Sequence, residues 1–139
     1  MPDYLLDTNA CMALINGSPE RVRVRFSDAV DSGARIWVPV LAMYELWYGV
    51  EKSTRREENA KRVATFVAGP IQLLAFEDTD AETAGLIRAT LEKMGTPIGA
   101  YDVLIAGQAI CRGLTLVTAN AREFKRVKNL KWENWAAKN

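Results

Sequence analysis

The sequence predicts an α/β fold with three layers, in which a mainly parallel β-sheet lies between two layers of helices. Short apolar or β-branched runs alternate with helical patterns along the chain, which is typical of parallel strands joined by crossover helices. The 139 residues are 49% hydrophobic and 25% charged, ordinary values for one globular domain. No repeat or low-complexity linker interrupts the pattern, so we expect a single domain over residues 1–139.

The first half of the chain opens with a strand that runs directly into a helix. Asp7-Thr8-Asn9 favours a helix N-cap after the apolar run, and Asn16-Gly17 favours the end of that helix. Ser18 is the expected cap of the next helix, with Pro19 in its first turn. The elements predicted up to residue 68 are a strand at 4–6, helices at 10–15 and 18–32, a strand at 35–38, and helices at 40–52 and 54–68.

The second half repeats the alternation of strand and helix. Thr79 is the expected cap of a long helix, with Glu82 three residues later as its reciprocal partner. Gly95 and Gly113 mark helix ends. The predicted elements are a strand at 72–75, helices at 79–94 and 100–112, a β-branched strand at 114–118 and a short strand near 130–132.

The composition excludes several kinds of chemistry. The chain has no histidine, which removes the commonest general base, the commonest nitrogen ligand of metals and every nucleophile paired with histidine. Cys11 and Cys111 lie in apolar helical patterns and are expected to be structural. The N-terminus lacks a signal sequence and no apolar run is long enough to cross a bilayer, so we expect a cytoplasmic protein without membrane association.

Basic residues concentrate at the C-terminal end although the net charge of the chain is only +1. Residues 112–139 contain seven basic and two acidic side chains. A basic face next to an acidic cluster would suit a phosphate backbone held against bound cations. An ordinary solvated surface explains the same pattern equally well.

Three carboxylates stand in apolar surroundings. Asp7 follows the first strand, at the end of a parallel sheet where ligands bind, although a plain helix N-cap is an equal alternative. Glu45 and Asp102 fall in helices that are apolar almost all round, where an ionised carboxylate needs a counter-charge or a metal. The structural alternative for these two is a salt bridge, with Arg112 or Lys93 as partner. Three oxygen ligands without histidine or thiolate favour Mg²⁺ or Mn²⁺, which typically serve phosphoryl chemistry.

Four ordered segments resemble the signature blocks of the PIN-domain ribonucleases of the VapC toxin type. They are Tyr4–Asn9, Val40–Gly49, Pro97–Ala106 and Leu116–Phe124. The resemblance spans nearly the whole chain and implies a five-stranded PIN-like sheet, Mg²⁺ or Mn²⁺ dependence and cleavage of a structured RNA, often tRNA. It also implies an antitoxin of the VapB type, a homodimer and higher toxin–antitoxin assemblies.

The acidic positions of the family match Asp7, Glu45 and Asp102. At the fourth acidic position many members have Asp, whereas this chain has Asn120, and Glu123 one turn later is the other candidate ligand. An amide oxygen accepts from a metal-bound water but carries no charge, so one metal or two stays open. The three carboxylates are predicted to hold one Mg²⁺, which activates water and leaves a 5′-phosphate and a 3′-hydroxyl.

The remaining site predictions concern RNA and partners. Polar side chains that would orient water or phosphate are Thr8, Asn9, Thr118 and Asn120, and those that would contact the RNA backbone are Arg122, Lys125 and Arg126. The aromatic residues beside Glu45, which are Tyr44, Trp47 and Tyr48, are expected in core or dimer packing. An apolar antitoxin helix is expected along the helices after the first two strands, with a basic side chain reaching the acidic pocket.

Three other functions are weighed against the nuclease. One is a non-catalytic RNA- or protein-binding module that keeps the carboxylates of a degenerate site, with Asn120 as the first loss. A receiver-type phosphorylation domain would need an acidic pair at the first strand and an Asp closing the third. A phosphatase would need a second carboxylate where Asn9 stands. The sequence disfavours these last two.

Overall fold

The computed structural model describes residues 2–138 and contains one parallel sheet. Its strand order is β3-β2-β1-β4-β5, so the first strand of the chain is central. The strands are β1 (Tyr4–Leu6), β2 (Ile36–Pro39), β3 (Gln72–Leu74), β4 (Thr115–Val117) and β5 (Trp132–Glu133). The prediction of a parallel sheet is confirmed, and so are its five strands.

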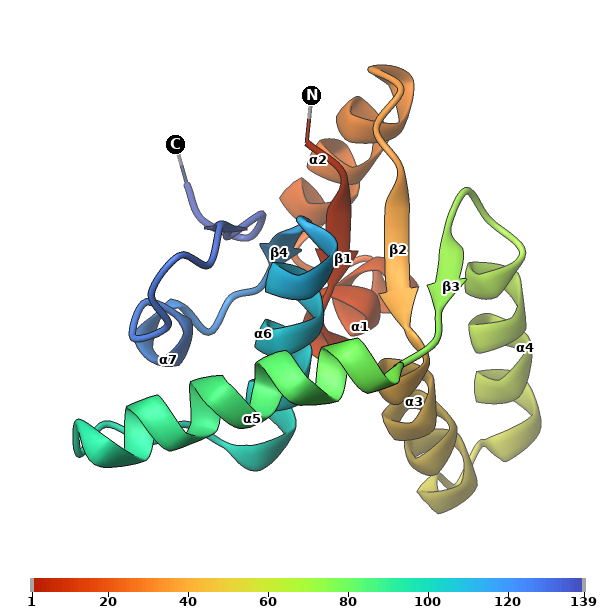
Figure 1. The fold of residues 1–139 in the computed structure, drawn as a ribbon. Helices are drawn as coiled ribbons and strands as arrows, with labels where there is room; N and C mark the ends of the chain where they lie inside the picture. Colours follow the sequence, from red (N-terminus) through yellow and green to blue (C-terminus); the bar gives the residue numbers. More distant parts are fainter. Residues whose placement is uncertain (1, 139) are drawn as a thin grey trace.

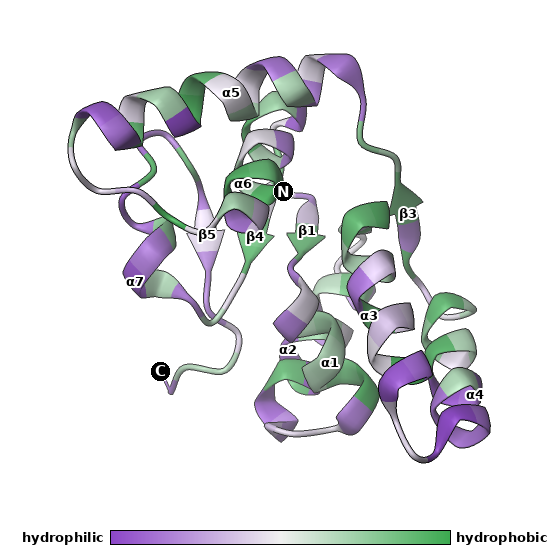
Figure 2. Cartoon of the chain, turned by 90° about the horizontal axis from the view of Figure 1, so that it is seen from below, coloured by the Kyte–Doolittle hydropathy of each residue, from purple (hydrophilic) through white to green (hydrophobic). Residues whose placement is uncertain are grey.

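Helices cover both faces of this sheet. The helices are α1 (Thr8–Asn16), α2 (Glu20–Asp31), α3 (Val40–Lys52), α4 (Arg56–Val67), α5 (Asp78–Lys93), α6 (Ala100–Arg112) and α7 (Ala121–Phe124). Figure 1 shows the strands running in one direction, and Figure 2 shows α5 and α6 on one side of the sheet with α1 to α4 on the other. The three-layer α/β architecture is therefore confirmed. Within the described residues, no helix combines the length and the apolar character needed to cross a membrane.

The two faces of the sheet carry separate apolar cores. Neighbouring residues of a strand point to opposite faces, so Leu5 and Leu6, both 0% exposed, belong to different clusters. Leu5 packs with Ile105 and Phe124 on the side of α6 and α7. Leu6 packs with residues of α1 to α4. Because β1 is buried on both faces, it is a continuous apolar run rather than an alternating one.

The register of β1 and β4 places the ends of these strands next to each other. Leu6 pairs with Val117, and the backbone N–H of Asp7 donates to the carbonyl of Val117 at 3.1 Å. Asp7 and Thr118, which follow the two strands, therefore leave the sheet side by side. In open parallel sheets the carboxyl ends of the strands form the ligand crevice.

Two predictions about helix starts are wrong. The helix α2 begins at Glu20 with Pro19 as its N-cap residue, so Ser18 lies too far back to cap it. The helix α5 begins at Asp78, and its capping box joins Glu77 and Asp80 instead of Thr79 and Glu82. The alternative capping box wins because Asp80 is also held from the other side by α6.

The helices α5 and α6 cross in very close contact. A side chain at Gly107 would bring its Cβ within 2.7 Å of the backbone and side chain of Ala84. The same pair of helices shares a buried ion pair, in which the guanidinium of Arg112 donates to both carboxylate oxygens of Asp80 at 3.0 Å. Asp80 is 0% exposed. These contacts fix α6, the helix that begins with the segment carrying Asp102.

Candidate active site

Asp7 lies at the N-terminus of α1, where it is both a cap and a site residue. Its Oδ1 accepts a hydrogen bond from the backbone N–H of Ala10 at 2.8 Å, so the N-cap interpretation is correct. The side chain is 6% exposed. Burial raises the pKa of Asp7, and hydrogen bonds from Thr118 and Ala10 only partly oppose that rise. A cation bound beside Asp7 would therefore stabilise its ionised carboxylate.

Asp102 lies in the first turn of α6 and is half-buried. Burial is the largest cause that raises its pKa to about 7, followed by a hydrogen bond to Glu123 and repulsion from Glu123, Asp7 and Glu45. These four carboxylates come from the starts of α1 and α6, from α3 and from α7. The structure thus brings together the three predicted acids and Glu123 at the carboxyl end of the sheet.

Glu45 is less buried than its apolar sequence neighbours predict. The side chain is partly exposed on α3, and the aromatic residues around it are exposed as well. Tyr44 is 71% exposed, Trp47 40% and Tyr48 57%. Packing of these aromatics in the core is therefore wrong, and dimer packing stays a prediction.

Asn120, which stands at the fourth acidic position of the predicted site, contacts two of the acids through its side chain. Its side-chain nitrogen donates to Oε2 of Glu123 at 2.8 Å and lies 3.5 Å from Oδ2 of Asp102. Its backbone N–H donates to the hydroxyl of Thr118 at 2.9 Å. Hydrogen bonds from Asp102 and Asn120, a backbone bond from Gly99 and the charge of Arg126 lower the pKa of Glu123. Glu123 is thus the more acidic member of the pair, and Asp102 keeps its proton to a higher pH.

Thr8 and Tyr101 form a polar link across the site that the sequence analysis missed. The hydroxyl oxygens of the two side chains are 2.8 Å apart and share a hydrogen bond. Burial is the main reason that the pKa of Tyr101 rises to about 12, and repulsion from Glu45 and Asp7 adds to it. The position of Tyr101 next to Asp102 was the available signal. Asn9, the other predicted polar residue of this turn, is exposed.

The basic residues predicted to contact RNA lie on and after α7. Arg122 and Lys125 are exposed, and Arg126 is exposed while donating to the carbonyl of Pro97 at 2.9 Å. Arg112, one of the two partners named for the alternative of a structural salt bridge, binds Asp80 instead. The salt bridges between described residues use other acids than Asp7, Glu45, Asp102 and Glu123.

The carboxylates are suitable ligands for a divalent cation by their chemistry, but they do not lie close enough together to form a complete metal site. Within residues 2–138, no three acidic, histidine or cysteine side chains stand close enough to form a ready-made metal cage. The donor set consists of oxygens, as Mg²⁺ and Mn²⁺ prefer. Burial raises the pKa of Asp7, and burial together with repulsion between the acids raises that of Asp102. Binding a cation would remove this repulsion.

Comparison with known proteins agrees with the fold. The family model described as PIN domain matches residues 4–130. The chain is 39% identical over 135 residues to the tRNA(fMet)-specific endonuclease VapC of Salmonella typhimurium, with 97% of this chain and 99% of the relative covered. It is 36% identical to Ribonuclease VapC2 of Rickettsia felis, with 95% and 97% covered.

Solved structures show the same architecture. The toxin–antitoxin complex VapBC2 of Rickettsia felis, bound to a promoter DNA fragment, contains a chain that superposes with a TM-score of 0.88 at 36% identity, covering 95% of this chain and 98% of that one. DNA-bound VapBC from Salmonella typhimurium gives 0.88 at 39% identity, with 97% and 99% covered. The matched segment includes all four acidic positions, and the relatives match almost end to end. The chain therefore belongs to the PIN-domain family, among its VapC-type ribonucleases.

Proposed function

We propose that this protein is an endoribonuclease that depends on a divalent metal ion, cleaves a structured RNA and acts as the toxin of a toxin–antitoxin pair. The observation that carries the proposal is the gathering of Asp7, Glu45, Asp102 and Glu123 at the carboxyl end of a parallel sheet, with burial and mutual repulsion raising the pKa of Asp102 to about 7. Such uncompensated carboxylates in a crevice are characteristic of functional sites.

Asp7, Glu45 and Asp102 are the proposed metal ligands, with Glu123 as the fourth acidic group. Mg²⁺ or Mn²⁺ suits these oxygen donors and, when bound, supplies charge neutralisation for the phosphodiester and a more acidic water. Asn120 donates to Glu123 and so positions this carboxylate beside Asp102. This assigns Glu123 to the place that Asp occupies in many relatives, with Asn120 as its positioning residue.

The polar and basic side chains around the acids would hold the RNA. Thr8, Asn9 and Thr118 lie next to Asp7, at the end of β1 and β4, where they can orient the scissile phosphate or the attacking water. Arg122, Lys125 and Arg126 follow from α7 and would contact the backbone, which contributes affinity and salt dependence but no sequence choice.

A tRNA is the proposed substrate class. Two relatives at 39% and 40% identity over nearly the full chain are named as endonucleases specific for tRNA(fMet). The anticodon loop of a tRNA presents unpaired bases, the form of RNA that proteins recognise by sequence.

We further propose that a VapB-like antitoxin inhibits the toxin by covering the groove beside Glu45. A pocket of about 310 Å³ opens there between α1, α3 and α4, lined by apolar side chains that include Met12, Ile15 and Leu46. An amphipathic helix fits such a groove, and a basic side chain on it would reach the acidic cluster. The structural neighbours include VapBC complexes, and the exposed aromatics of α3 offer a surface for the proposed homodimer and higher assemblies.

Digestion of total tRNA and rRNA by the purified protein tests the nuclease. We expect one or a few cleavage sites with Mg²⁺ or Mn²⁺, products with a 5′-phosphate and a 3′-hydroxyl, and no cleavage with EDTA or with Asp7→Asn. Sequencing the product ends identifies the RNA. Cleavage that survives both EDTA and Asp7→Asn, or a 2′,3′-cyclic phosphate product, would contradict the proposal. RNA binding without any metal-dependent cleavage would show a non-catalytic module instead.

A further inference from the structure

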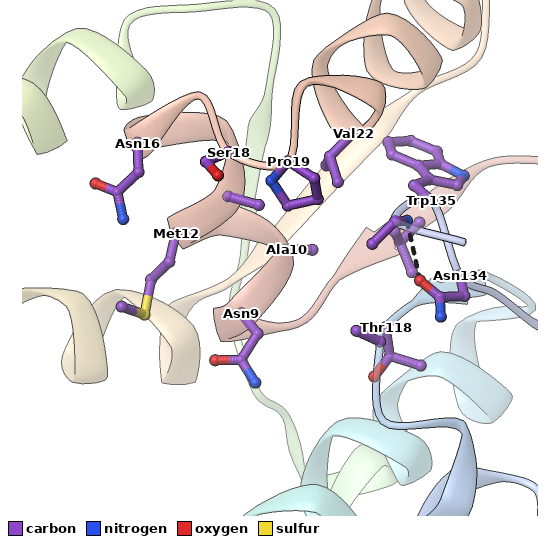
Figure 3. A pocket seen from close by; sticks show the side chains of 14 residues that line it. Asn9, Ala10, Met12, Asn16, Ser18, Pro19, Val22, Thr118, Asn134 and Trp135 are labelled. Atoms are coloured by element: carbon purple, nitrogen blue, oxygen red, sulfur yellow. Dashed lines mark hydrogen bonds between the residues drawn. The ribbon is translucent and has the colours of Figure 1, made fainter. Parts of the chain in front are cut away.

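A neutral pocket of about 340 Å³ lies beside the acidic cluster, on the side of α1 that faces α2. Its walls come from α1, the start of α2, the end of β4 and the C-terminal segment, and none of its lining residues is charged. They are Asn9, Ala10, Met12, Ala13, Asn16, Ser18, Pro19, Val22, Val117, Thr118, Ala119, Asn134, Trp135 and Ala136. Figure 3 shows Asn9 and Thr118 at one end of this space, with Pro19, Val22 and Trp135 at the other.

The C-terminal wall of this pocket is held in place by aromatic packing and hydrogen bonds. Trp135 is 3% exposed, packs edge-on against Tyr4 with ring centroids 5.1 Å apart, and donates from Nε1 to Glu133 at 3.0 Å. Arg21 and Arg25 of α2 donate to the carbonyls of Ala136 and Asn134, at 2.9 and 3.3 Å. These arginines hold the segment in place while their charges stay outside the pocket lining.

The pocket is continuous with the proposed cleavage site. Thr118 lines the pocket and also forms hydrogen bonds with Asp7 and with the backbone of Asn120. Asn9 and Ala10 line it from the first turn of α1, the helix that Asp7 caps. The first turn of α1 therefore joins the carboxylate of Asp7 to the rim of the pocket.

Two amides of the pocket lining, those of Asn9 and Asn134, keep free hydrogen-bonding capacity. Among the described residues, the side chain of Asn9 forms no hydrogen bond, and Asn134 uses only its Oδ1, which accepts from the backbone of Ala136 at 2.9 Å. Its Nδ2 is left to donate. An Asn amide both donates and accepts, which matches the edges of nucleobases. The absence of a positive side chain in the lining disfavours a phosphate group.

We propose that this pocket takes one unstacked nucleobase of the RNA, next to the phosphodiester that faces the acidic cluster. Apolar walls contact the faces of the base, and Asn9 and Asn134 bond its edge. The size lies at the lower end for small-molecule pockets, about 300–1,000 Å³, which suits a single base but not a helical segment. Enzymes that act on structured RNA commonly recognise bases splayed out of loops in this way. The inference rests on the proposed nuclease function and adds a specificity subsite to it.

Titration of the metal-free protein with mononucleotides tests the pocket without any cleavage. In ¹H–¹⁵N spectra we expect the side-chain amide signals of Asn9 and Asn134 to shift saturably with at least one of AMP, CMP, GMP and UMP. Ribose 5-phosphate, which lacks a base, should leave them unchanged. Equal shifts with ribose 5-phosphate, or no shift with any nucleotide, would overturn the proposal. A response to an antitoxin peptide alone would assign the pocket to the antitoxin and would also overturn it.

Two variants and a control locate the effect. Asn134→Asp keeps the acceptor for the backbone of Ala136 but removes the donor, and Asn9→Ala changes an exposed side chain, so both variants should fold. Each should weaken nucleotide binding about fivefold, the usual effect of one hydrogen bond. Gln72→Glu makes the same amide-to-carboxylate change at the opposite edge of the sheet and should have no effect.

RNA with single abasic nucleotides then separates this proposal from the nuclease proposal. Cleavage of intact RNA by the wild-type protein measures the nuclease alone. If the pocket holds a base, removing the base at one position beside the cleaved bond slows the wild type, and this penalty shrinks in Asn134→Asp. A penalty of equal size in both proteins would overturn the pocket proposal while leaving the nuclease intact.

Discussion

The side-chain nitrogen of Asn120 donates a hydrogen bond to Oε2 of Glu123 at 2.8 Å and lies 3.5 Å from Oδ2 of Asp102. Carboxylate oxygens accept hydrogen bonds, so Asn120 presents its NH₂ group, and not its carbonyl oxygen, to the two acids. An aspartate in its place would add a third negative charge against them. Asn120 therefore holds Glu123 as the nearby acid.

Glu123→Gln and Asn120→Ala should both slow RNA cleavage, but differently. We expect Glu123→Gln to raise the Mg²⁺ concentration needed for half-maximal cleavage, because it removes a negative charge from the site. Asn120→Ala should lower the rate by about 10- to 100-fold, typical for loss of a group that orients a metal ligand. Single-turnover cleavage across a Mg²⁺ titration measures both effects, with Glu57→Gln on the exposed face of α4 as the control. Normal metal dependence in Glu123→Gln would exclude it as the fourth acid.

The pKa of Asp102 predicts how the stability of the metal-free protein depends on pH. Its folded-state pKa of about 7 is raised above the ordinary value of 3.8 for this carboxyl group. Between these values the native state binds a proton that the unfolded chain lacks, so the stability from this group is present at low pH and is lost as pH rises through 7. The metal-free protein should therefore lose thermal stability between pH 5 and pH 8.

Asp102→Asn isolates this effect. Without metal the variant should melt a few degrees higher than the wild type at pH 8, because it lacks the repelled charge, and the difference should shrink as the pH falls toward 4. Added Mg²⁺ should raise the melting temperature of the wild type at pH 8 but not that of the variant. Calorimetry at both pH values provides the measurement. Parallel pH profiles for the two proteins would show that Asp102 does not titrate in this range.

The hydrogen bond between Tyr101 and Thr8 predicts a positioning role for the phenol. Tyr101→Phe keeps the ring and removes the hydroxyl, and we expect cleavage to slow by roughly tenfold, at the low end for loss of an orienting group. The melting temperature should change little, because one hydrogen bond contributes about 1 kcal/mol. Thr8→Ser keeps the hydroxyl and should retain activity. Equal rates in Tyr101→Phe and the wild type would make the contact structural only.

The buried ion pair of Asp80 and Arg112 predicts a large loss of stability when one partner is removed. Burial alone would raise the pKa of Asp80, but hydrogen bonds from Arg112 and from the backbone of Glu77 hold it below its usual value. Arg112→Met leaves a carboxylate that is 0% exposed without its cation, which should cost about 3 kcal/mol of the free energy of unfolding. Urea denaturation measures the loss.

Arg88→Met provides the matched control for that variant. Arg88 forms an i,i+4 salt bridge with Glu92 at 3.0 Å, and the side chains are 63% and 55% exposed. Pairs of this kind contribute about 0.3–0.5 kcal/mol. A loss in Arg112→Met no larger than in Arg88→Met would mean that water or another group compensates Asp80.

Much of the fold could be predicted from the sequence because local patterns determine it. The apolar run of β1, the capping by Asp7 and the glycine ends of α1 and α6 are local signals, and each appears in the structure. The four-residue helix α7 was not predicted, since it is too short for a periodic pattern. The capping box of α5 was misplaced because the choice of Asp80 depends on a distant partner, Arg112.

For the site, the sequence by itself determined which residues carry the acidic chemistry. A chain without histidine leaves carboxylates as its available ligands, and the blocks around Asp7, Glu45 and Asp102 indicate the family before any coordinates. These features are visible in the sequence because they depend on residue type and on neighbours along the chain.

Only the tertiary structure decided which side chains these acids contact and which residues stay exposed beside them. In the structure, Asn120 donates a hydrogen bond to Glu123, and Tyr101 shares one with Thr8 across the site. Arg112 binds Asp80, and the aromatic side chains of α3 are exposed. Each of these contacts joins residues from different elements or depends on the direction of a side chain. Distances of this kind depend on how strands and helices pack, which the order of residues along one chain does not reveal.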